Sequence, residues 1–176
     1  DIRYAVSWKC RKAQLHGFYF EGFQETPRFQ SGKCLAIDHN GREYPLEIKK
    51  LSSRKYDIVL GNSKAFSDGL LTYYFEYSAN LEDSGQLVYT ESDYGKLAVF
   101  NWAPVQWEDP LEHETVTIHF PVVMPSEKVS AQILDSIHFM TEKFVNKRYL
   151  ISYFTEKNKN QEDLLAVRFH KNNLPS

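Results

Sequence analysis

The feature that most constrains the fold is an alternation of apolar and polar residues with a period of two, which recurs along most of the chain. In one stretch, Leu71, Tyr73, Phe75, Tyr77 and Ala79 fall on one face and their neighbours on the other. Successive side chains of a β-strand point to opposite faces, so this pattern is typical of a half-buried strand. The same reasoning predicts strands at 4–10, 17–23, 33–37, 44–48, 55–60, 70–79, 114–122, 148–154 and 164–170.

Polar turn signals separate these strands at intervals of about ten residues. Asn40-Gly41 is the strongest hairpin signal, because a type I′ turn needs positive φ at both central positions and this pair tolerates it. The first 125 residues hold no helical pattern that would link parallel strands. The sequence therefore predicts a mainly β fold: an antiparallel β-sandwich, immunoglobulin-like or jelly-roll-like, as a single domain over 1–176.

The segment 127–145 departs from this alternation. It contains neither Gly nor Pro, and Val129, Ile133, Ile137, Met140 and Phe144 recur at steps of three and four residues. That spacing is typical of one face of a helix. Because part of the segment also fits two short strands, the sequence leaves one short helix around 127–145 and a pair of strands as alternatives.

Length and charge narrow the class of protein. The chain has 176 residues, enough to bury a core without metals or disulfides. Its 21 basic and 23 acidic residues give a formal net charge of −2 without any long basic block, so nucleic acid is not an expected partner. No run of 18 apolar residues occurs, and this chain has no predicted membrane span.

Cys10 and Cys34 are the only cysteines in the sequence. Their spacing fits neither a Cys-x-x-Cys redox pair nor a zinc site. Two interpretations stay open at this point. Either both thiols are free and buried, or the two cysteines form one disulfide, which would indicate an oxidising compartment.

Motifs of familiar catalytic chemistry are absent from the sequence. There is no Gly-x-Ser-x-Gly elbow, no Gly-x-Gly-x-x-Gly and no phosphate-binding loop of the P-loop type. His113 and His119 share a face of one predicted strand, but about 20 Å separates them, too far to hold one metal ion. We therefore predict no catalytic residues, no metal and no cofactor. The sequence favours a protein that is not an enzyme, with a hydrolase assembled from distant loops as an alternative.

Aromatic residues are the best candidates for a binding site. They make up 15% of the chain, and exposed rings on a β-sandwich bind protein partners or stack on sugars. Two tryptophans flank a proline turn between the strands 96–100 and 114–122. They could bind a partner, or they could pack in the corner between these strands. The sequence predicts a module for protein-protein binding or complex assembly, with a carbohydrate-binding module that binds a glycan as the alternative. The candidate binding residues are Trp102, Trp107, Tyr94 and Tyr89, with the acidic pair Glu108 and Asp109.

A family resemblance covers most of the chain: its main motifs lie in 67–125, the hairpin 36–62 precedes them and the closing strand 163–175 follows. It comprises a Thr72-Tyr73-x-x-x-Tyr77 strand, the run Phe100-Asn101-Trp102, a second tryptophan after a proline turn, and a strand that ends in Phe120-Pro121. In these features the chain resembles the extracytoplasmic domain of the YciQ-like predicted membrane proteins, a family of unknown function. The resemblance implies a β-sandwich and brings no catalytic residues with it.

The same resemblance implies a cellular setting. It places a signal peptide before Asp1 and a transmembrane helix after Ser176. The chain would then be the ectodomain of a membrane-anchored protein and would face an extracytoplasmic space or an organelle lumen. Its contact with the membrane would come only through segments outside this chain.

Overall fold

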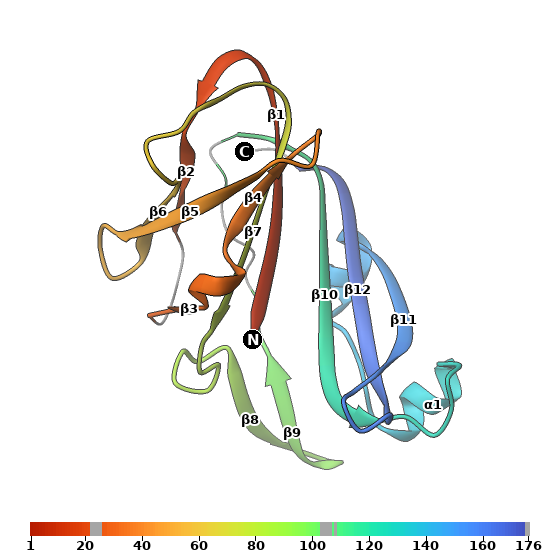
Figure 1. Cartoon of the computed structure of the whole chain (residues 1–176). Coiled ribbons are helices and arrows are strands. Elements are labelled where there is room, and N and C mark those ends of the chain that lie inside the picture. Colours follow the sequence, from red (N-terminus) through yellow and green to blue (C-terminus); the bar gives the residue numbers. More distant parts are fainter. Residues whose placement is uncertain (22–25, 103–106, 108, 175–176) are drawn as a thin grey trace. The chain divides into compact units, whose positions relative to one another are not determined.

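The computed structural model describes residues 1–21, 26–102, 107 and 109–174. The chain is 59% strand and 9% helix with antiparallel sheets, which confirms the mainly β, antiparallel fold predicted from the sequence. Two compact units divide the chain: unit 1 is Asp1–Gln106 and unit 2 is Trp107–Ser176 (Figure 1). The single domain over 1–176 stays a prediction.

Among the described residues of unit 1, one seven-stranded antiparallel sheet dominates. Its strand order is β1-β7-β4-β5-β6-β2, and the short β3 also pairs with β7. The predicted alternation is present, since Leu71, Tyr73, Phe75 and Tyr77 of β7 are all buried. The strands are β1 (Ile2–Leu15), β2 (Gly17–Glu21), β3 (Arg28–Phe29), β4 (Leu35–Asp38), β5 (Glu43–Lys50), β6 (Lys55–Leu60) and β7 (Phe66–Ser78), with a 3-10 helix η1 (Ser31–Lys33) before β4.

The sheet of unit 1 curls until its two outermost strands approach each other. β1 and β2 stand at opposite ends of the strand order, yet the rings of Tyr4 and Phe20 are 4.9 Å apart, edge to face. The rings of Trp8 and Phe18 on the same two strands are 6.1 Å apart. Aromatic pairs at such separations attract each other beyond the gain from burial alone. The curled sheet therefore closes around an aromatic core in a barrel-like arrangement.

The step from β1 into β2 depends on a glycine. Gly17 pairs with Val59 of β6, and a Cβ atom at position 17 would overlap the carbonyl oxygen of Ile58. Any other residue would have to push β2 away from β6. The backbone of β2 can approach β6 this closely because Gly17 has no side chain.

The hairpin between β4 and β5 forms as predicted, but the type I′ turn is wrong. Gly41 has a positive φ of 81° and Asn40 does not. The Gly41 N–H donates to the carbonyl oxygen of Asp38 (2.9 Å), so the turn is centred on His39-Asn40 instead. The Asp38 carboxylate accepts the backbone N–H groups of Asn40 (2.8 Å) and Arg42 (3.0 Å). These bonds hold the turn in the shape that an aspartate at its first position favours.

A second, two-stranded sheet of unit 1 consists of β8 (Leu87–Ser92) and β9 (Gly95–Phe100). This hairpin extends away from the seven-stranded sheet (Figure 1). β9 matches the strand predicted at 96–100, whereas β8 was not predicted. In β8 the adjacent residues Val88, Tyr89 and Thr90 are all exposed, so apolar and polar positions do not alternate.

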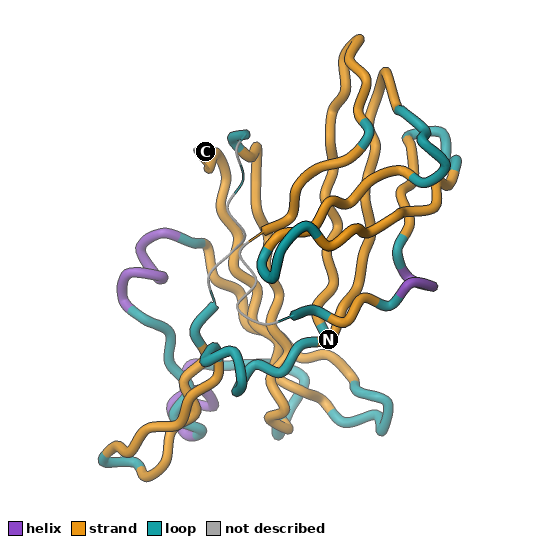
Figure 2. The backbone as a smooth tube through the Cα atoms, turned by 90° about the vertical axis from the view of Figure 1, so that its left-hand side faces the viewer, coloured by secondary structure: helices purple, strands orange, loops and turns teal. Residues whose placement is uncertain are grey.

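Unit 2 contains, among its described residues, a three-stranded antiparallel sheet in the order β10-β12-β11. Met124, Leu165 and Val167 are its buried core, and side chains such as Ile133 and Phe139 pack against them. One face of the sheet is therefore covered by α1 and the turn that follows it; Figure 2 shows the short helices in purple. The elements are β10 (Leu111–Val123), α1 (Ala131–Ser136), α2 (Lys143–Arg148), β11 (Leu150–Lys157) and β12 (Asp163–Leu174).

The segment predicted as one short helix or two strands holds two short helices. Ser130 caps α1, because its hydroxyl oxygen accepts the N–H of Ile133 (3.3 Å). α1 ends at Ser136, and His138 adopts a positive φ of 53° that cannot continue a helix. Neither of these helices, nor any other in the described ranges, is long and apolar enough to cross a membrane.

Candidate functional site

The hairpin β8–β9 holds two of the predicted binding residues at exposed positions. Tyr89 is 50% exposed on β8, and Tyr94 in the connecting turn is 63% exposed. The Ser92 hydroxyl accepts the backbone N–H of Tyr94 (3.1 Å) and donates to the carbonyl oxygen of Gly95 (2.9 Å). These two bonds fix the turn, so Tyr94 stands at the tip of a defined hairpin.

Two contacts hold the ring of Tyr89. Its hydroxyl donates to Oε1 of Glu82 (3.0 Å), and the Lys96 ammonium lies 4.7 Å from the ring centroid. The hydrogen bond to Glu82 raises the pKa of Tyr89, and the charge of that carboxylate raises it further. On β9, the small residue Ala98 is the direct partner of Tyr89. An exposed ring that is already ordered loses little entropy when it contacts a partner.

Among the described residues, the outer edge of β9 offers backbone groups that no other strand pairs with. The N–H of Asn101 donates to the carbonyl oxygen of Gln86 (2.7 Å). Along an antiparallel strand, every second residue directs its backbone N–H and C=O groups toward the partner strand, so this bond shows which residues of β9 face β8. The backbone of Val99 and Leu97 therefore faces β8, whereas that of Lys96 and Ala98 faces outward. Within the part of the chain that the structure describes, β9 pairs with β8 alone.

The remaining candidate residues are divided between the two units. Trp102 is half-buried just after β9 and its ring stacks on Phe100 at 6.1 Å, which agrees with a packing role at the base of the hairpin. Trp107 is half-buried and Asp109 is exposed, but both belong to unit 2. Glu108 lies outside the described residues. The structure thus places Tyr89, Tyr94 and Trp102 in unit 1, and Trp107 and Asp109 in unit 2.

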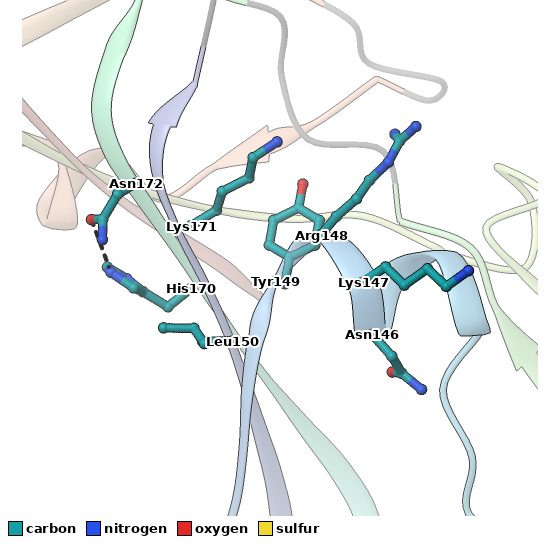
Figure 3. A pocket seen from close by; sticks show the side chains of 8 residues that line it. All are labelled: Asn146, Lys147, Arg148, Tyr149, Leu150, His170, Lys171 and Asn172. Carbon is teal, nitrogen blue, oxygen red and sulfur yellow. Dashed lines mark hydrogen bonds between the residues drawn. The ribbon is translucent and has the colours of Figure 1, made fainter.

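Sequence reasoning missed a second feature, a pocket of about 310 Å³ on unit 2. It lies where α2 ends, β11 begins and β12 approaches its end. Lys147, Arg148, Tyr149 and Lys171 line it, and the side chains of the last three extend in a common direction (Figure 3). No local sequence signal would have revealed this pocket, because its lining residues come from two separate segments, 146–150 and 170–172.

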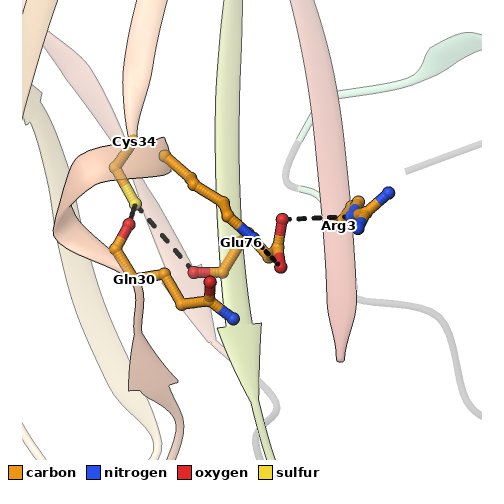
Figure 4. A network of polar contacts seen from close by, with 5 residues as sticks. Arg3, Gln30, Cys34 and Glu76 are labelled. Carbon is orange, nitrogen blue, oxygen red and sulfur yellow. Dashed lines mark hydrogen bonds and ion pairs between the residues drawn. The ribbon is translucent and has the colours of Figure 1, made fainter. Parts of the chain in front are cut away.

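A polar network on unit 1 surrounds Glu76, whose side chain is almost fully buried (Figure 4). The Lys33 ammonium donates to its Oε1 (2.8 Å) and the Arg3 guanidinium to its Oε2 (3.0 Å). The hydrogen bond from Lys33 lowers the pKa of Glu76; burial opposes that effect and the Arg3 charge adds to it. Because both carboxylate oxygens have partners, this network stabilises the sheet and leaves no group for a ligand.

Cys10 and Cys34 are both free thiols, and both are buried. Cys10 lies opposite Gly69 of β7, while the Cys34 sulfur points toward the carbonyl oxygen of Glu76 (4.0 Å). Seven residues of an extended strand span roughly 23 Å, so the two cysteines lie far beyond the reach of a disulfide. The disulfide that the sequence left open does not form in this structure.

Histidines and acids do not assemble a metal centre in the described ranges, where no group of three His, Cys, Asp or Glu side chains could hold an ion. The His113 and His170 rings are 6.0 Å apart, but the His170 ring nitrogens contact Thr115 (2.8 Å) and Asn172 (3.1 Å). These contacts describe a hydrogen-bonded polar surface.

Comparison with known proteins gives no match. No protein-family model, no curated protein and no solved structure is significantly similar to the chain. The hairpin β8–β9 and the pocket of unit 2 therefore have to be interpreted from their own geometry.

Proposed function

We propose that this chain is a non-catalytic binding module and that the hairpin β8–β9 binds a protein partner through an extended segment of that partner. The observation that carries the proposal is the outer edge of β9. Its outward N–H and C=O groups at Lys96 and Ala98 are the groups that a further strand would pair with.

The composition of β9 supports pairing with an apolar strand. Leu97, Ala98, Val99 and Phe100 follow one another, and Lys96 is the single charged residue of the strand. Natural edge strands usually avoid pairing by means of charged residues, proline or a bulge. An isolated two-stranded sheet is also marginal in stability, and a third strand would stabilise it.

The exposed rings would add specificity to this strand pairing. Tyr89 and Tyr94 are large, partly apolar side chains beside the proposed edge, and tyrosines are frequent among the residues that dominate interface energies. Backbone pairing supplies affinity with little regard to sequence, whereas side chains that contact such rings select the partner.

The cellular setting of the module is also a proposal. The resemblance to the YciQ-like proteins supports an ectodomain of a membrane-anchored protein, in an extracytoplasmic space or an organelle lumen. In that setting the module would act in the assembly of a complex at the membrane surface.

A labelled peptide tests the proposal directly. The probe is a fluorescein-labelled peptide with the sequence of Gly95–Asn101, which is itself an apolar extended segment. We expect saturable binding in fluorescence anisotropy. Ala98→Pro removes the outward N–H from the edge and should weaken binding at least about tenfold.

The matched control is Ala98→Ser, which keeps the N–H and should bind like the wild type. Circular dichroism of both variants establishes that the hairpin and its sheet are retained. The proposal is wrong if the peptide does not bind the wild-type chain, or if the folded Ala98→Pro variant binds it as tightly as Ala98→Ser does.

A further inference from the structure

The pocket of unit 2 is lined by an excess of positive charge. Lys147, Arg148 and Lys171 contribute three cationic side chains, and none of the eight lining residues is acidic. Within the described residues, none of the three has a carboxylate oxygen within ion-pair distance. Two of the three lie beside rings: Arg148 is 5.9 Å from the centroid of the Phe144 ring, and Lys171 is 5.8 Å from that of the Tyr149 ring.

The position of Lys171 sets this pocket apart from an ordinary helix end. Basic residues in the last turn of a helix complement its dipole, and that effect accounts for Lys147 and Arg148 at the end of α2. It does not account for Lys171, which comes from β12 and is half-buried. Strand and helix thus supply cations to one pocket from separate segments.

Tyr149 lies between these cations and is held in place. Its ring meets that of Phe169 edge to face at 6.4 Å, and Phe169 packs against the core of unit 2. Figure 3 shows the Tyr149 hydroxyl, the Lys171 ammonium and the Arg148 guanidinium extending to the same side. Three donors thus face the same side of the pocket, and the central one is anchored by packing.

Glu114 is the acidic residue that lies directly opposite Lys171 in the pairing of β10 with β12. Its Oε2 atom is buried without a hydrogen-bond partner in the described part of the chain. Its charge acts on both Lys171 and Tyr149. Since no ion pair forms between Glu114 and Lys171, the ammonium of Lys171 stays available to another anion.

We propose that this pocket binds a phosphate group. A pocket lined by three cations suits a phosphate dianion better than it suits a carboxylate with one negative charge. The planar guanidinium of Arg148 and the Tyr149 hydroxyl can donate hydrogen bonds to phosphate oxygens. The phosphate could belong to a small soluble molecule or to a lipid headgroup, and both present the same chemistry to these side chains.

Nuclear magnetic resonance titration of the full chain with inorganic phosphate tests this proposal. We expect saturable shifts that centre on Tyr149, His170 and Lys171. Arg148→Gln and Lys171→Gln should each weaken binding about tenfold. Glu114→Gln removes the competing carboxylate and should tighten binding.

Lys159→Gln is the matched control, because Lys159 is an exposed lysine in the turn between β11 and β12, at the opposite end of these strands from the pocket. It should leave binding unchanged. Arg148 is exposed on α2, so its variant tests the site even if Lys171→Gln does not fold. No saturable shift with phosphate, or equal weakening by Lys159→Gln and Arg148→Gln, would overturn the proposal.

Vesicles distinguish the two sources of the phosphate. One set contains phosphatidylcholine alone and the other also contains phosphatidic acid. Co-sedimentation with the second set that is lost in Arg148→Gln supports a lipid headgroup. Phosphate binding in solution without such co-sedimentation supports a soluble ligand, and the pocket assignment stands in either case.

Discussion

The two units differ in how they pair carboxylates that are removed from solvent: those of unit 1 are buried and that of unit 2 is half-buried. In unit 1, Glu76 accepts from both Lys33 and Arg3, and Asp38 accepts two backbone N–H groups and the Tyr44 hydroxyl (3.1 Å). The hydrogen bond from Arg42 lowers the pKa of Asp38, against the effect of burial. In unit 2, burial raises the pKa of Glu114, and Lys171 only partly offsets it.

This difference indicates that the polar network of unit 1 has a structural role, whereas the pocket of unit 2 keeps cations that can bind another anion. A carboxylate with partners at each oxygen contributes to one well-defined native state. A half-buried carboxylate with an unpartnered oxygen costs free energy, and the cations near it stay available. Among the residues that the structure describes, unit 1 therefore provides partners for both oxygens of its buried carboxylates Glu76 and Asp38, whereas unit 2 leaves one oxygen of Glu114 without a partner beside its pocket.

The largest effect should come from the closure of the unit 1 sheet. Phe20 is fully buried where β1 and β2 approach, so Phe20→Ala should lower the free energy of unfolding by about 3–5 kcal/mol in urea denaturation. Tyr19→Ala is the matched control, because Tyr19 on the same strand is 55% exposed. It should cost about 1 kcal/mol or less, through its contact with Lys55. Similar losses for both variants would contradict a closed aromatic core.

A smaller loss is expected in the core of unit 2. Leu165 is fully buried, and Leu165→Ala should cost about 2–3 kcal/mol, since the partly exposed side chains of α1 can relax toward the space. The control is Leu150→Ala on β11, whose side chain is 71% exposed and should matter by less than about 0.5 kcal/mol. A loss as large as that of Phe20→Ala would show that the two cores are equally rigid.

The sequence predicts the parts of this fold that depend on neighbouring residues. Alternation is local, so the strand that carries Tyr73 and most of β10 are both predicted correctly. The curling of the sheet depends on contacts such as Tyr4 with Phe20, which no local pattern contains. β8 was missed because its exposed side chains have no buried face to alternate with.

The candidate sites show the same limit. Tyr89 and Tyr94 can be selected from the sequence as surface aromatics, because turn residues surround them. The pairing of Glu114 with Lys171 follows from the register between β10 and β12, and register depends on the packing of the whole unit. The pocket was therefore beyond the reach of sequence reasoning.

The network around Glu76 should lose its effect in acid. The pKa of Glu76 is lowered in the folded state by Lys33 and Arg3, so its contribution is present above the unfolded-state pKa of about 4.3 and is lost as the pH falls through the lower folded value. Glu76→Gln should lower the urea midpoint at neutral pH, by less than Leu165→Ala does. The wild-type and variant curves should converge in acid, and a constant gap across pH would contradict this role.

The smallest effect should come from Glu114, and with the opposite sign. Its pKa is raised by burial, so the protonated form stabilises the folded state; this contribution is full below the unfolded-state pKa of about 4.3 and is lost as the pH rises through the folded value. Glu114→Gln should therefore raise stability at neutral pH, by roughly 1 kcal/mol or less, because the side chain is only half-buried and solvent screens its charge. The two proteins should be equally stable in acid.

Glu112→Gln, an exposed position on the same strand, is the control and should change stability by less than about 0.5 kcal/mol at either pH. A Glu114→Gln variant that loses stability at neutral pH would mean that this carboxylate is paired in solution, and unit 2 would then resemble unit 1.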